Sequence, residues 1–380
     1  MNTNANCRVC GSDYYDKALL SYNNMPSSAQ GFAELGELEN DNGSSLNVFQ
    51  CSTCGLVQLN NNPVPYYKEV IRASAFSDEM KEFRSEQFQS WIKKYKLANK
   101  KILEIGSGKG EYLEILSHSG VQTFGVEYSK HSVNYCNKKK LVVTRGFLGD
   151  KDLNLSGQPY DGFMCLSFME HWPNPNKVLR SLSENLSDGA IGLVEVPNFD
   201  MILDKGLYSE FISDHLLYFT EKTLIFTLQL NGFEVLECKP IWYNYILSAV
   251  VQKRVKTDLN YLQEFKIKVK KDLDEFIGKF PKKRVAIWGA GHQALATISL
   301  TEIGEKIKYI IDSAVFKQGK YSPSSHIQIV SENALNDDSV EAVIIMAGSY
   351  SDEILKIMIR KYPNISIAVL REHGLELINN

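Results

Sequence analysis

Short apolar runs alternate with stretches of helical periodicity through the middle of the chain. The apolar runs predict five strands, at 101–105, 123–127, 141–144, 162–167 and 190–196. Between them, apolar residues recur at helical spacing in three segments, at 111–118, 130–138 and 176–186. Apolar strands that alternate with helices are typical of a parallel sheet covered on both faces. We therefore predict an α/β fold with a doubly wound, Rossmann-like sheet.

The same pattern continues on either side of this sheet. An amphipathic helix is predicted from Ser77, another helix at 221–230, and two β-rich runs from Phe233 to about Gln252. A charged amphipathic helix at 258–278 then leads into a second series of strands, at 284–288, 307–311, 342–347 and 365–370. The chain therefore carries two Rossmann-like units in series.

The length of 380 residues favours two or three domains over one. The pattern predicts an N-terminal module at 1–65, a central α/β domain at 66–255 and a second, C-terminal α/β domain at 256–380. The net charge of −3 gives the chain no bulk attraction to nucleic acid or to an anionic membrane. The sequence also lacks an apolar run of membrane-spanning length and a signal peptide at its start. We expect a cytoplasmic protein whose partner is a small molecule.

Four of the seven cysteines form two matched pairs near the N-terminus, Cys7 with Cys10 and Cys51 with Cys54, and a glycine follows each pair. Two residues between cysteines allow both thiolates to face one ion, and two such knuckles complete a tetrahedral Cys₄ zinc site. Because protein ligands would fill all four positions, the predicted zinc is structural. The alternative is four unrelated buried cysteines.

A glycine-rich turn follows the first central strand, with glycines at Gly106, Gly108 and Gly110. Such glycines allow the backbone to approach a ligand closely, and Glu127 at the end of the next strand is placed to accept hydrogen bonds from ribose hydroxyls. Glu104 comes just before the glycines, where its carboxylate would repel a pyrophosphate but suits a cationic ligand. S-adenosylmethionine offers a ribose, an ammonium and a sulfonium without a phosphate, and we predict it as the cofactor.

Two further pairs of residues are predicted to line this cofactor. Gly146 and Phe147 follow the third strand, where the adenine of such cofactors lies, although packing explains Phe147 equally well. Ser167 and Phe168 follow the fourth strand and are expected to contact the cofactor through the backbone and the ring.

A second glycine turn, at 289–291, has no carboxylate before it, and Asp312 ends the strand that follows. Alone it would pass as a dinucleotide-binding turn. It would equally suit a turn that serves packing only, or a site for a different nucleotide. We favour a platform for a nucleotide-linked substrate.

Together, the paired cysteines, the turn at 103–110 and the trailing Gly-Ala-Gly turn resemble the three-part bacterial sugar C-methyltransferase family. The resemblance covers nearly the whole chain and includes 312–323, which is similar to the family's C-terminal motif. It implies a zinc-binding N-terminal domain, a class I methyltransferase domain and a C-terminal Rossmann-like domain. It also implies methylation of a carbon beside the keto group of a nucleotide-linked 4-keto-deoxysugar.

The segments 169–175 and 214–219 match the two histidine regions of that family. A carbon nucleophile requires a base and a donor that stabilises the enolate oxygen. His215 is the candidate base, with Asp214 nearby to influence it or to serve the substrate or the backbone. His171 lies at the carboxyl end of a central strand, where it would hydrogen-bond the oxygen or act as the base itself.

Two positions depart from the family pattern. Ile212 stands where a tyrosine usually precedes the acidic–histidine pair, and the run Val70–Ser74 lacks the usual tyrosines. These departures keep O- or N-methylation of a sugar or a related metabolite open as a second hypothesis. An NAD-linked oxidoreductase that uses the second glycine turn is a third hypothesis, and a zinc-containing binding module without catalysis is a fourth.

Overall fold

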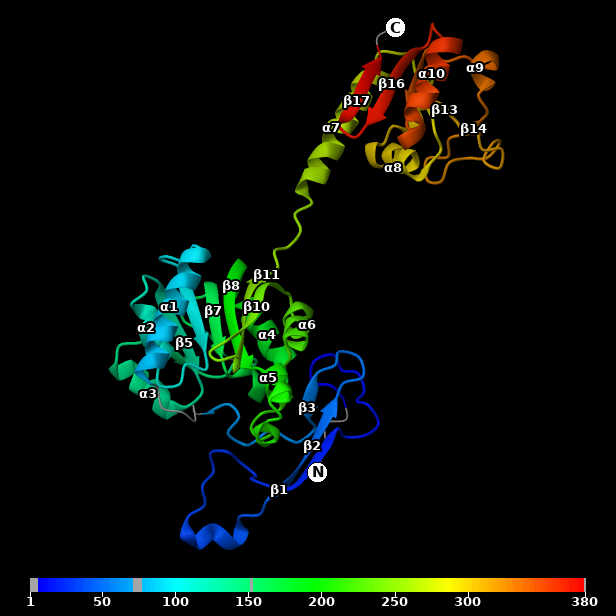
Figure 1. Ribbon diagram of the computed structural model, residues 1–380. Helices are drawn as coiled ribbons and strands as arrows, with labels where there is room; N and C mark the ends of the chain where they lie inside the picture. The colour runs from blue at the N-terminus through cyan, green and yellow to red at the C-terminus, as the bar shows by residue number, and fades with distance from the viewer. Residues whose placement is uncertain (1–5, 71–76, 151–152, 379–380) are drawn as a thin grey trace. The chain divides into compact units, whose positions relative to one another are not determined.

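The computed structural model describes residues 6–70, 77–150 and 153–378 of the chain (Figure 1). These fall into two compact units, Met1–Lys256 and Thr257–Asn380. The predicted boundary at residue 65 therefore separates two parts of one compact unit. Of the tyrosine-free run at Val70–Ser74, all but Val70 lies outside the described residues.

A seven-stranded sheet forms the centre of the first unit, and its strands lie in the order β10-β11-β8-β7-β4-β5-β6. The strands between β8 and β6 pair in parallel, whereas β11 is antiparallel to both β8 and β10. This order confirms the predicted doubly wound α/β sheet. The strand bounds are β4 Lys101–Ile105, β5 Gln122–Glu127, β6 Val143–Arg145, β7 Tyr160–Leu166, β8 Leu186–Pro197, β10 Phe233–Ile241 and β11 Ile246–Lys253.

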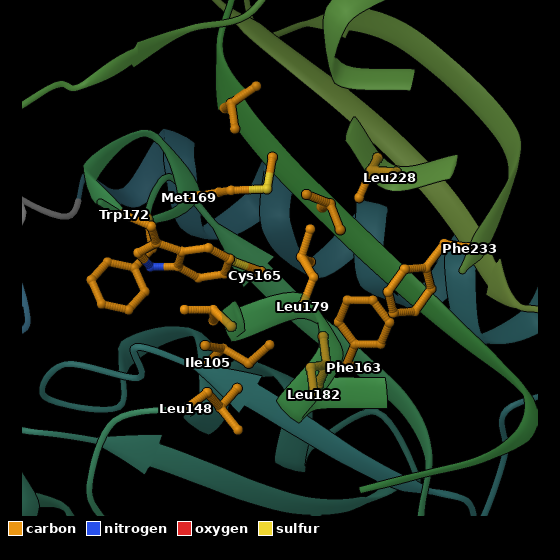
Figure 2. Close-up of a cluster of buried hydrophobic side chains, with 14 of the residues drawn as sticks. Ile105, Leu148, Phe163, Cys165, Met169, Trp172, Leu179, Leu182, Leu228 and Phe233 are labelled. Carbon is orange, nitrogen blue, oxygen red and sulfur yellow. The ribbon is translucent and has the colours of Figure 1, made fainter. Parts of the chain in front are cut away.

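Helices cover both faces of this sheet (Figure 1). On one face, α1 and α2 pack on Ile102, Met164 and Leu193 of the strands. On the other, α4 and α6 pack on Phe163 and Cys165 of β7, as Figure 2 shows for the leucines of both helices. The helix bounds are α1 Asp78–Lys94, α2 Glu111–Ser117, α3 Lys130–Lys138, α4 Pro175–Glu184, α5 Phe199–Asp204 and α6 Glu221–Leu230.

A buried ion pair fastens α1 to the middle of the sheet. Arg84 Nη1 of α1 lies 2.6 Å from Glu195 Oε2 of β8, and both side chains are almost fully buried. Gln87 and Ser248 donate further hydrogen bonds to the same carboxylate. Such partners are needed because a buried charge left unpaired is strongly destabilising.

A second sheet in this unit joins the N-terminal region to the rest of the chain. Its order is β1-β2-β3-β9, with β1 Leu20–Met25, β2 Ser44–Gln50, β3 Val57–Leu59 and β9 Leu217–Tyr218. The first three strands come from the predicted zinc module, but β9 begins two residues after His215. The predicted module is therefore completed by a strand of the central domain.

The second unit confirms the predicted C-terminal Rossmann-like fold. Its sheet has the order β14-β13-β12-β15-β16-β17, and every pair is parallel except β16 with β17, which form a final hairpin that the apolar pattern does not predict. Its strands are β12 Val285–Trp288, β13 Ile307–Ile311, β14 Ile329–Val330, β15 Ala342–Ile345, β16 Ser366–Arg371 and β17 Gly374–Ile378. Its helices are α7 Asn260–Ile277, α8 His292–Thr301, α9 Ala334–Asp337 and α10 Ser351–Lys361. Across the described parts of both units, no helix combines the length and the hydrophobicity that crossing a membrane requires.

Candidate active site

The four predicted metal ligands converge on one point. The sulfur atoms of Cys7, Cys10, Cys51 and Cys54 all lie within 4.8 Å of one another, and none forms a disulfide. The Cys7–Cys54 and Cys10–Cys51 sulfur distances are 3.6 and 3.4 Å. Four thiolates at about 2.3 Å from a tetrahedral zinc ion lie at comparable separations. The geometry therefore fits a four-coordinate metal.

The conformation of the first glycine turn explains its composition. Gly106, Gly108 and Gly110 have φ values of +70°, +54° and +80°, a region that disfavours residues with a Cβ atom. A Cβ atom on Gly106 would also lie 2.7 Å from the ring of Phe168. The turn between β4 and α2 thus requires glycine for its backbone conformation and for its contact with the segment that follows β7.

Glu127 fastens this turn to the end of β5. Its carboxylate accepts hydrogen bonds from the backbone N–H groups of Gly108, at 2.9 Å, and Ser129, at 2.8 Å. Burial raises the pKa of Glu127, and these two N–H groups oppose that effect. Glu104 is buried at the end of the neighbouring strand β4.

A pocket opens beside the turn at the carboxyl ends of β4, β5 and β7. Five of the eight predicted cofactor residues line it: Gly106, Glu127, Gly146, Phe147 and Phe168. The other three, Glu104, Gly108 and Ser167, belong to the same strand ends and turns. Ligands of open α/β sheets bind at this edge.

Lys68, which no sequence pattern predicts, also lines this pocket. Its ammonium nitrogen lies 4.9 Å from the ring centre of Tyr128 and 5.1 Å from that of Phe147. It also forms an ion pair with Asp150 at 2.9 Å. A lone lysine in a connector carries no pattern that would have identified it.

The two candidate catalytic histidines lie together. The ring centres of His171 and His215 are 4.7 Å apart and the rings are nearly perpendicular. The His171 ring also lies 6.4 Å from that of Phe168, which lines the pocket beside the first glycine turn. The histidine pair therefore adjoins the predicted cofactor site.

The hydrogen bonding of His171 defines its tautomer. Its Nδ1 lies 2.7 Å from the carbonyl oxygen of Asp214. Because a carbonyl oxygen only accepts hydrogen bonds, Nδ1 carries the hydrogen and Nε2 keeps its lone pair. Glu170 Oε1 lies 3.8 Å from Nε2, and the ligand atoms of Glu170, His171 and His215 are all within 4.8 Å of one another.

Burial leaves all three groups without charge near neutral pH. It lowers the pKa of His171 to about 4, and burial together with the nearby His171 lowers the pKa of His215 to about 3. Burial also raises the pKa of Glu170 to about 8. A protonated carboxyl can donate a hydrogen bond, and neutral imidazoles can accept protons. Among the described residues, Glu170 Oε2 has no hydrogen-bond partner.

The carboxylate of Asp214 faces the N-terminal region. It accepts hydrogen bonds from the hydroxyl of Tyr66, at 2.7 Å, and from the backbone N–H of Ala29, at 2.8 Å. No hydrogen bond joins this carboxylate to His215 within the described ranges.

Ile212, at the position of the family's tyrosine, donates its backbone N–H to the Tyr218 hydroxyl at 3.0 Å. Tyr66 lies outside both positions at which the family pattern predicts a tyrosine, the run Val70–Ser74 and Ile212.

The second glycine turn is fixed by its neighbours. A Cβ atom on Gly289 would lie 2.5 Å from the carbonyl oxygen of Met346. Asp312 accepts hydrogen bonds from the backbone N–H of Ala290, at 2.8 Å, and from the Lys317 ammonium, at 2.9 Å. The carboxylate that would bind a ribose in a dinucleotide site is therefore engaged within the chain.

Comparison with known proteins gives matches to both α/β parts. Residues 80–238 match the model of a methyltransferase domain, and residues 250–363 match that of a C-methyltransferase C-terminal domain. The chain is 21% identical over 390 residues to C-methyltransferase NovU of Streptomyces niveus, across 92% of this chain and 91% of that protein. It is 24% identical over 238 residues to the ubiquinone biosynthesis O-methyltransferase of Aliivibrio fischeri, across 54% of this chain and 97% of that enzyme.

Two solved structures are also similar to part of the chain. An S-adenosylmethionine-dependent methyltransferase from Clostridium acetobutylicum has 15% identity and a TM-score of 0.40, across 50% of this chain and 96% of that one. The plantazolicin methyltransferase BpumL in complex with SAH has 16% identity and a TM-score of 0.38, across 47% of this chain and 86% of that one.

Proposed function

We propose that this S-adenosylmethionine-dependent methyltransferase, which is similar to multi-domain C-methyltransferases, methylates a carbon beside the keto group of a nucleotide-linked 4-keto-deoxysugar. The observation that carries this proposal is the close grouping of His171, His215 and Glu170, whose ligand atoms lie within 4.8 Å of one another, beside the ring of Phe168 in the pocket at the first glycine turn. Carbon methylation needs both a base and a donor to an enolate oxygen. This group of side chains offers both.

In this proposal the partly exposed His215 removes the proton from the carbon. His171, whose Nδ1 hydrogen is committed to the Asp214 carbonyl, presents the Nε2 lone pair and keeps the neighbouring imidazole in place. Glu170, protonated near neutral pH, donates a hydrogen bond to the enolate oxygen. Asp214 positions these groups through its backbone carbonyl, since its carboxylate is engaged by Tyr66 and Ala29.

The cofactor is proposed to lie in the pocket beside the first glycine turn. Glu127 is placed for the ribose hydroxyls, and Phe147 and Phe168 for the adenine and its surroundings. The remaining contacts are assigned to Glu104, Gly106, Gly108, Gly146 and Ser167. Bound there, the cofactor supplies an electrophilic methyl group, and the apolar walls exclude water from the reaction.

The four clustered cysteines are proposed to hold a structural zinc ion. Backbone N–H groups point at two of the sulfurs, from Val9 to Cys7 Sγ and from Thr53 to Cys51 Sγ, each at 3.4 Å. Such donors favour the thiolate form that binds a metal. The second unit is proposed to bind the nucleotide of the substrate.

Deuterium exchange at the carbon beside the ketone tests the proposed reaction. In heavy water with a nucleotide-linked 4-keto-deoxysugar, the enzyme should catalyse exchange, and His215→Ala should remove this activity. His131→Ala, a change at an exposed histidine of α3, is the matched control and should exchange normally. If the wild-type enzyme methylates a sugar without any exchange, O- or N-methylation replaces the proposed reaction.

A further inference from the structure

The cysteine cluster lies against both segments that carry the candidate catalytic histidines. We name residues 169–175 the first histidine segment and residues 213–218 the second histidine segment. Arg8, between Cys7 and Cys10, donates a hydrogen bond from its guanidinium to the carbonyl of Pro173 at 3.2 Å. The next residue, Val9, accepts a hydrogen bond from the Asn176 side chain at 2.6 Å. The first cysteine pair thus holds the end of the first histidine segment.

The second cysteine pair leads directly to the other segment. Strand β3 begins three residues after Cys54 and pairs with β9, the strand that follows His215. Gln58 lies opposite Leu217, and the N–H of Leu59 donates to the carbonyl of Leu216 at 2.9 Å. A change in the position of β3 would therefore move the backbone beside His215.

Gln58 connects these two features chemically. Its side chain is fully buried, its amide nitrogen donates to Cys7 Sγ at 3.2 Å, and its amide oxygen accepts the backbone N–H of Arg8 at 3.0 Å. A hydrogen bond to a charged thiolate is stronger than one to a neutral thiol. One side chain thus joins a metal-ligand sulfur to the strand that is paired beside the catalytic histidine.

The chain between the cysteine pairs adds contacts to the second histidine segment. The N–H of Ala29 donates to the Asp214 carboxylate, and the hydroxyl of Ser213 donates to the carbonyl of Pro26 at 3.0 Å. The carbonyl of Asp214 in turn accepts the hydrogen bond from His171. The contacts therefore extend from the cysteine cluster to both imidazoles.

We infer that the Cys₄ site positions the His171–His215 pair and that Gln58 is the positioning residue between them. This inference rests on the proposed function for the catalytic role of the histidines. The first glycine turn is held by β4, β5 and Glu127, so cofactor affinity depends much less on the cysteine cluster. Loss of the metal or of the Gln58 amide thus changes the histidine geometry and slows the chemistry while cofactor binding remains.

The test compares Gln58→Met, which keeps the length of the side chain and removes its hydrogen bonds, with Ser52→Ala. Ser52 lies in the second cysteine pair, and its exposed hydroxyl donates to the carbonyl of Asp13, away from the histidine segments. Three quantities are measured on the full-length, zinc-loaded proteins: S-adenosylmethionine affinity by calorimetry, the deuterium-exchange rate, and the imidazole signals of His171 and His215 by NMR. Zinc removal from the wild-type protein with a chelator is the third sample.

Gln58→Met and zinc removal should each shift both imidazole signals and lower the exchange rate, by up to about 100-fold for a misplacement near 1 Å. S-adenosylmethionine affinity should change little, and Ser52→Ala should match the wild type throughout. If Gln58→Met does not fold, Arg8→Met tests the same connection through the first histidine segment.

Unchanged imidazole signals after zinc removal and in Gln58→Met would overturn the inference, as would equal shifts in Ser52→Ala. A wild-type enzyme that catalyses no exchange would instead count against the proposed function. The imidazole signals would still decide the inference in that case, because they do not depend on turnover.

Discussion

The two glycine turns of this chain have the same local plan but different surroundings. Each follows the first strand of a Rossmann-like sheet, and each contacts a carboxylate at the end of the next strand, Glu127 in the first unit and Asp312 in the second. The first turn lines a pocket. At the second, the Lys317 ammonium binds both Asp312 and the carbonyl of Ala290. The second turn therefore differs from the first in that an ammonium group of the chain is bonded to its carboxylate.

The two carboxylates also differ in their electrostatics. Burial raises the pKa of Glu127 despite its two backbone donors. Burial acts in the same direction on Asp312, but Lys317 and the N–H groups of Ala314 and Ala290 lower its pKa below the ordinary value. Lys317, five residues after Asp312, therefore stabilises the charged Asp312 carboxylate. In a dinucleotide site, a ribose hydroxyl would donate a hydrogen bond to that carboxylate instead.

Substitution of the glycines should give the largest difference in S-adenosylmethionine affinity between the two turns. Gly106→Val should weaken S-adenosylmethionine binding at least about 100-fold, about 2.8 kcal/mol, because it combines a strained φ with overlap on Phe168. Gly289→Val should leave this affinity unchanged and lower the melting temperature of the second unit, because its side chain meets the Met346 carbonyl. Calorimetry and thermal unfolding measure both effects.

Gly36→Ala is the control for this comparison, since its backbone is unstrained and no atom lies within 4 Å of the added Cβ. If Gly289→Val reduced cofactor affinity as much as Gly106→Val, the contrast between the turns would be wrong.

The histidines beside the first turn should give this unit a pH dependence that the second turn lacks. The unfolded chain protonates His171 near its ordinary pKa of 6.5, whereas the folded chain does so only near 4. Neutral, buried His171 therefore contributes about 3 kcal/mol to the free energy of unfolding above pH 6.5. This contribution is lost as the pH falls from 6.5 to 4. His171→Asn should remove this part of the slope, as measured by denaturant unfolding at several pH values.

Glu170 gives a pH dependence of stability that is opposite in sign to that of His171. Its pKa is raised from 4.5 to about 8, so the folded chain keeps a proton that the unfolded chain releases, and stability falls as the pH rises through this range. Glu170→Gln should make the free energy of unfolding depend less on pH between 4.5 and 8. Asp312→Asn should change the pH dependence of stability in neither the His171 range nor the Glu170 range. The lowered pKa of Asp312 affects stability only below about pH 3.8. An identical pH profile for the wild type and both active-site variants would show that these groups are not buried without charge.

Removal of the carboxylates should give the smallest of the three contrasts. Glu127→Ala should reduce S-adenosylmethionine affinity by about tenfold or somewhat more, the usual value of hydrogen bonds to a charged group. Asp312→Ala should leave that affinity unchanged and destabilise the second unit by about 1–3 kcal/mol, because Lys317 loses its partner. Equal effects of both changes on cofactor binding would contradict the assignment of the first turn alone to S-adenosylmethionine.

The elements that could be predicted are those whose signal lies within a short stretch of chain. Strands such as Lys101–Ile105 and Ile307–Ile311 have the predicted bounds because continuous apolar runs are distinctive. The predicted helix at 176–186 ran too far: α4 ends at Glu184, and Leu186 already belongs to β8. Apolar residues on both sides of this junction are buried in the same core, so hydrophobic periodicity alone does not show where the helix ends and the strand begins.

Other parts of the site depend on contacts between distant residues. Tyr66 bonds to Asp214, Gln58 bonds to Cys7 and pairs across to Leu217, and Lys68 lies over the rings of Tyr128 and Phe147. None of these residues lies in a motif. Their contacts depend on tertiary packing such as the β3–β9 pairing, which joins segments that are separated by more than 150 residues.

The sequence by itself determined the two Rossmann-like sheets, the paired cysteines, and the glycine turn with Glu104 and Glu127, because the alternation of strands and helices and the glycine positions are local patterns. Only the tertiary structure decided that Asp214 faces Tyr66 instead of His215, that Lys317 bonds to Asp312 at the second turn, and that the cysteine cluster adjoins both histidine segments. The physical reason is that hydrogen-bond partners and burial depend on how distant segments pack. The charge states of His171, His215 and Glu170 depend on that burial.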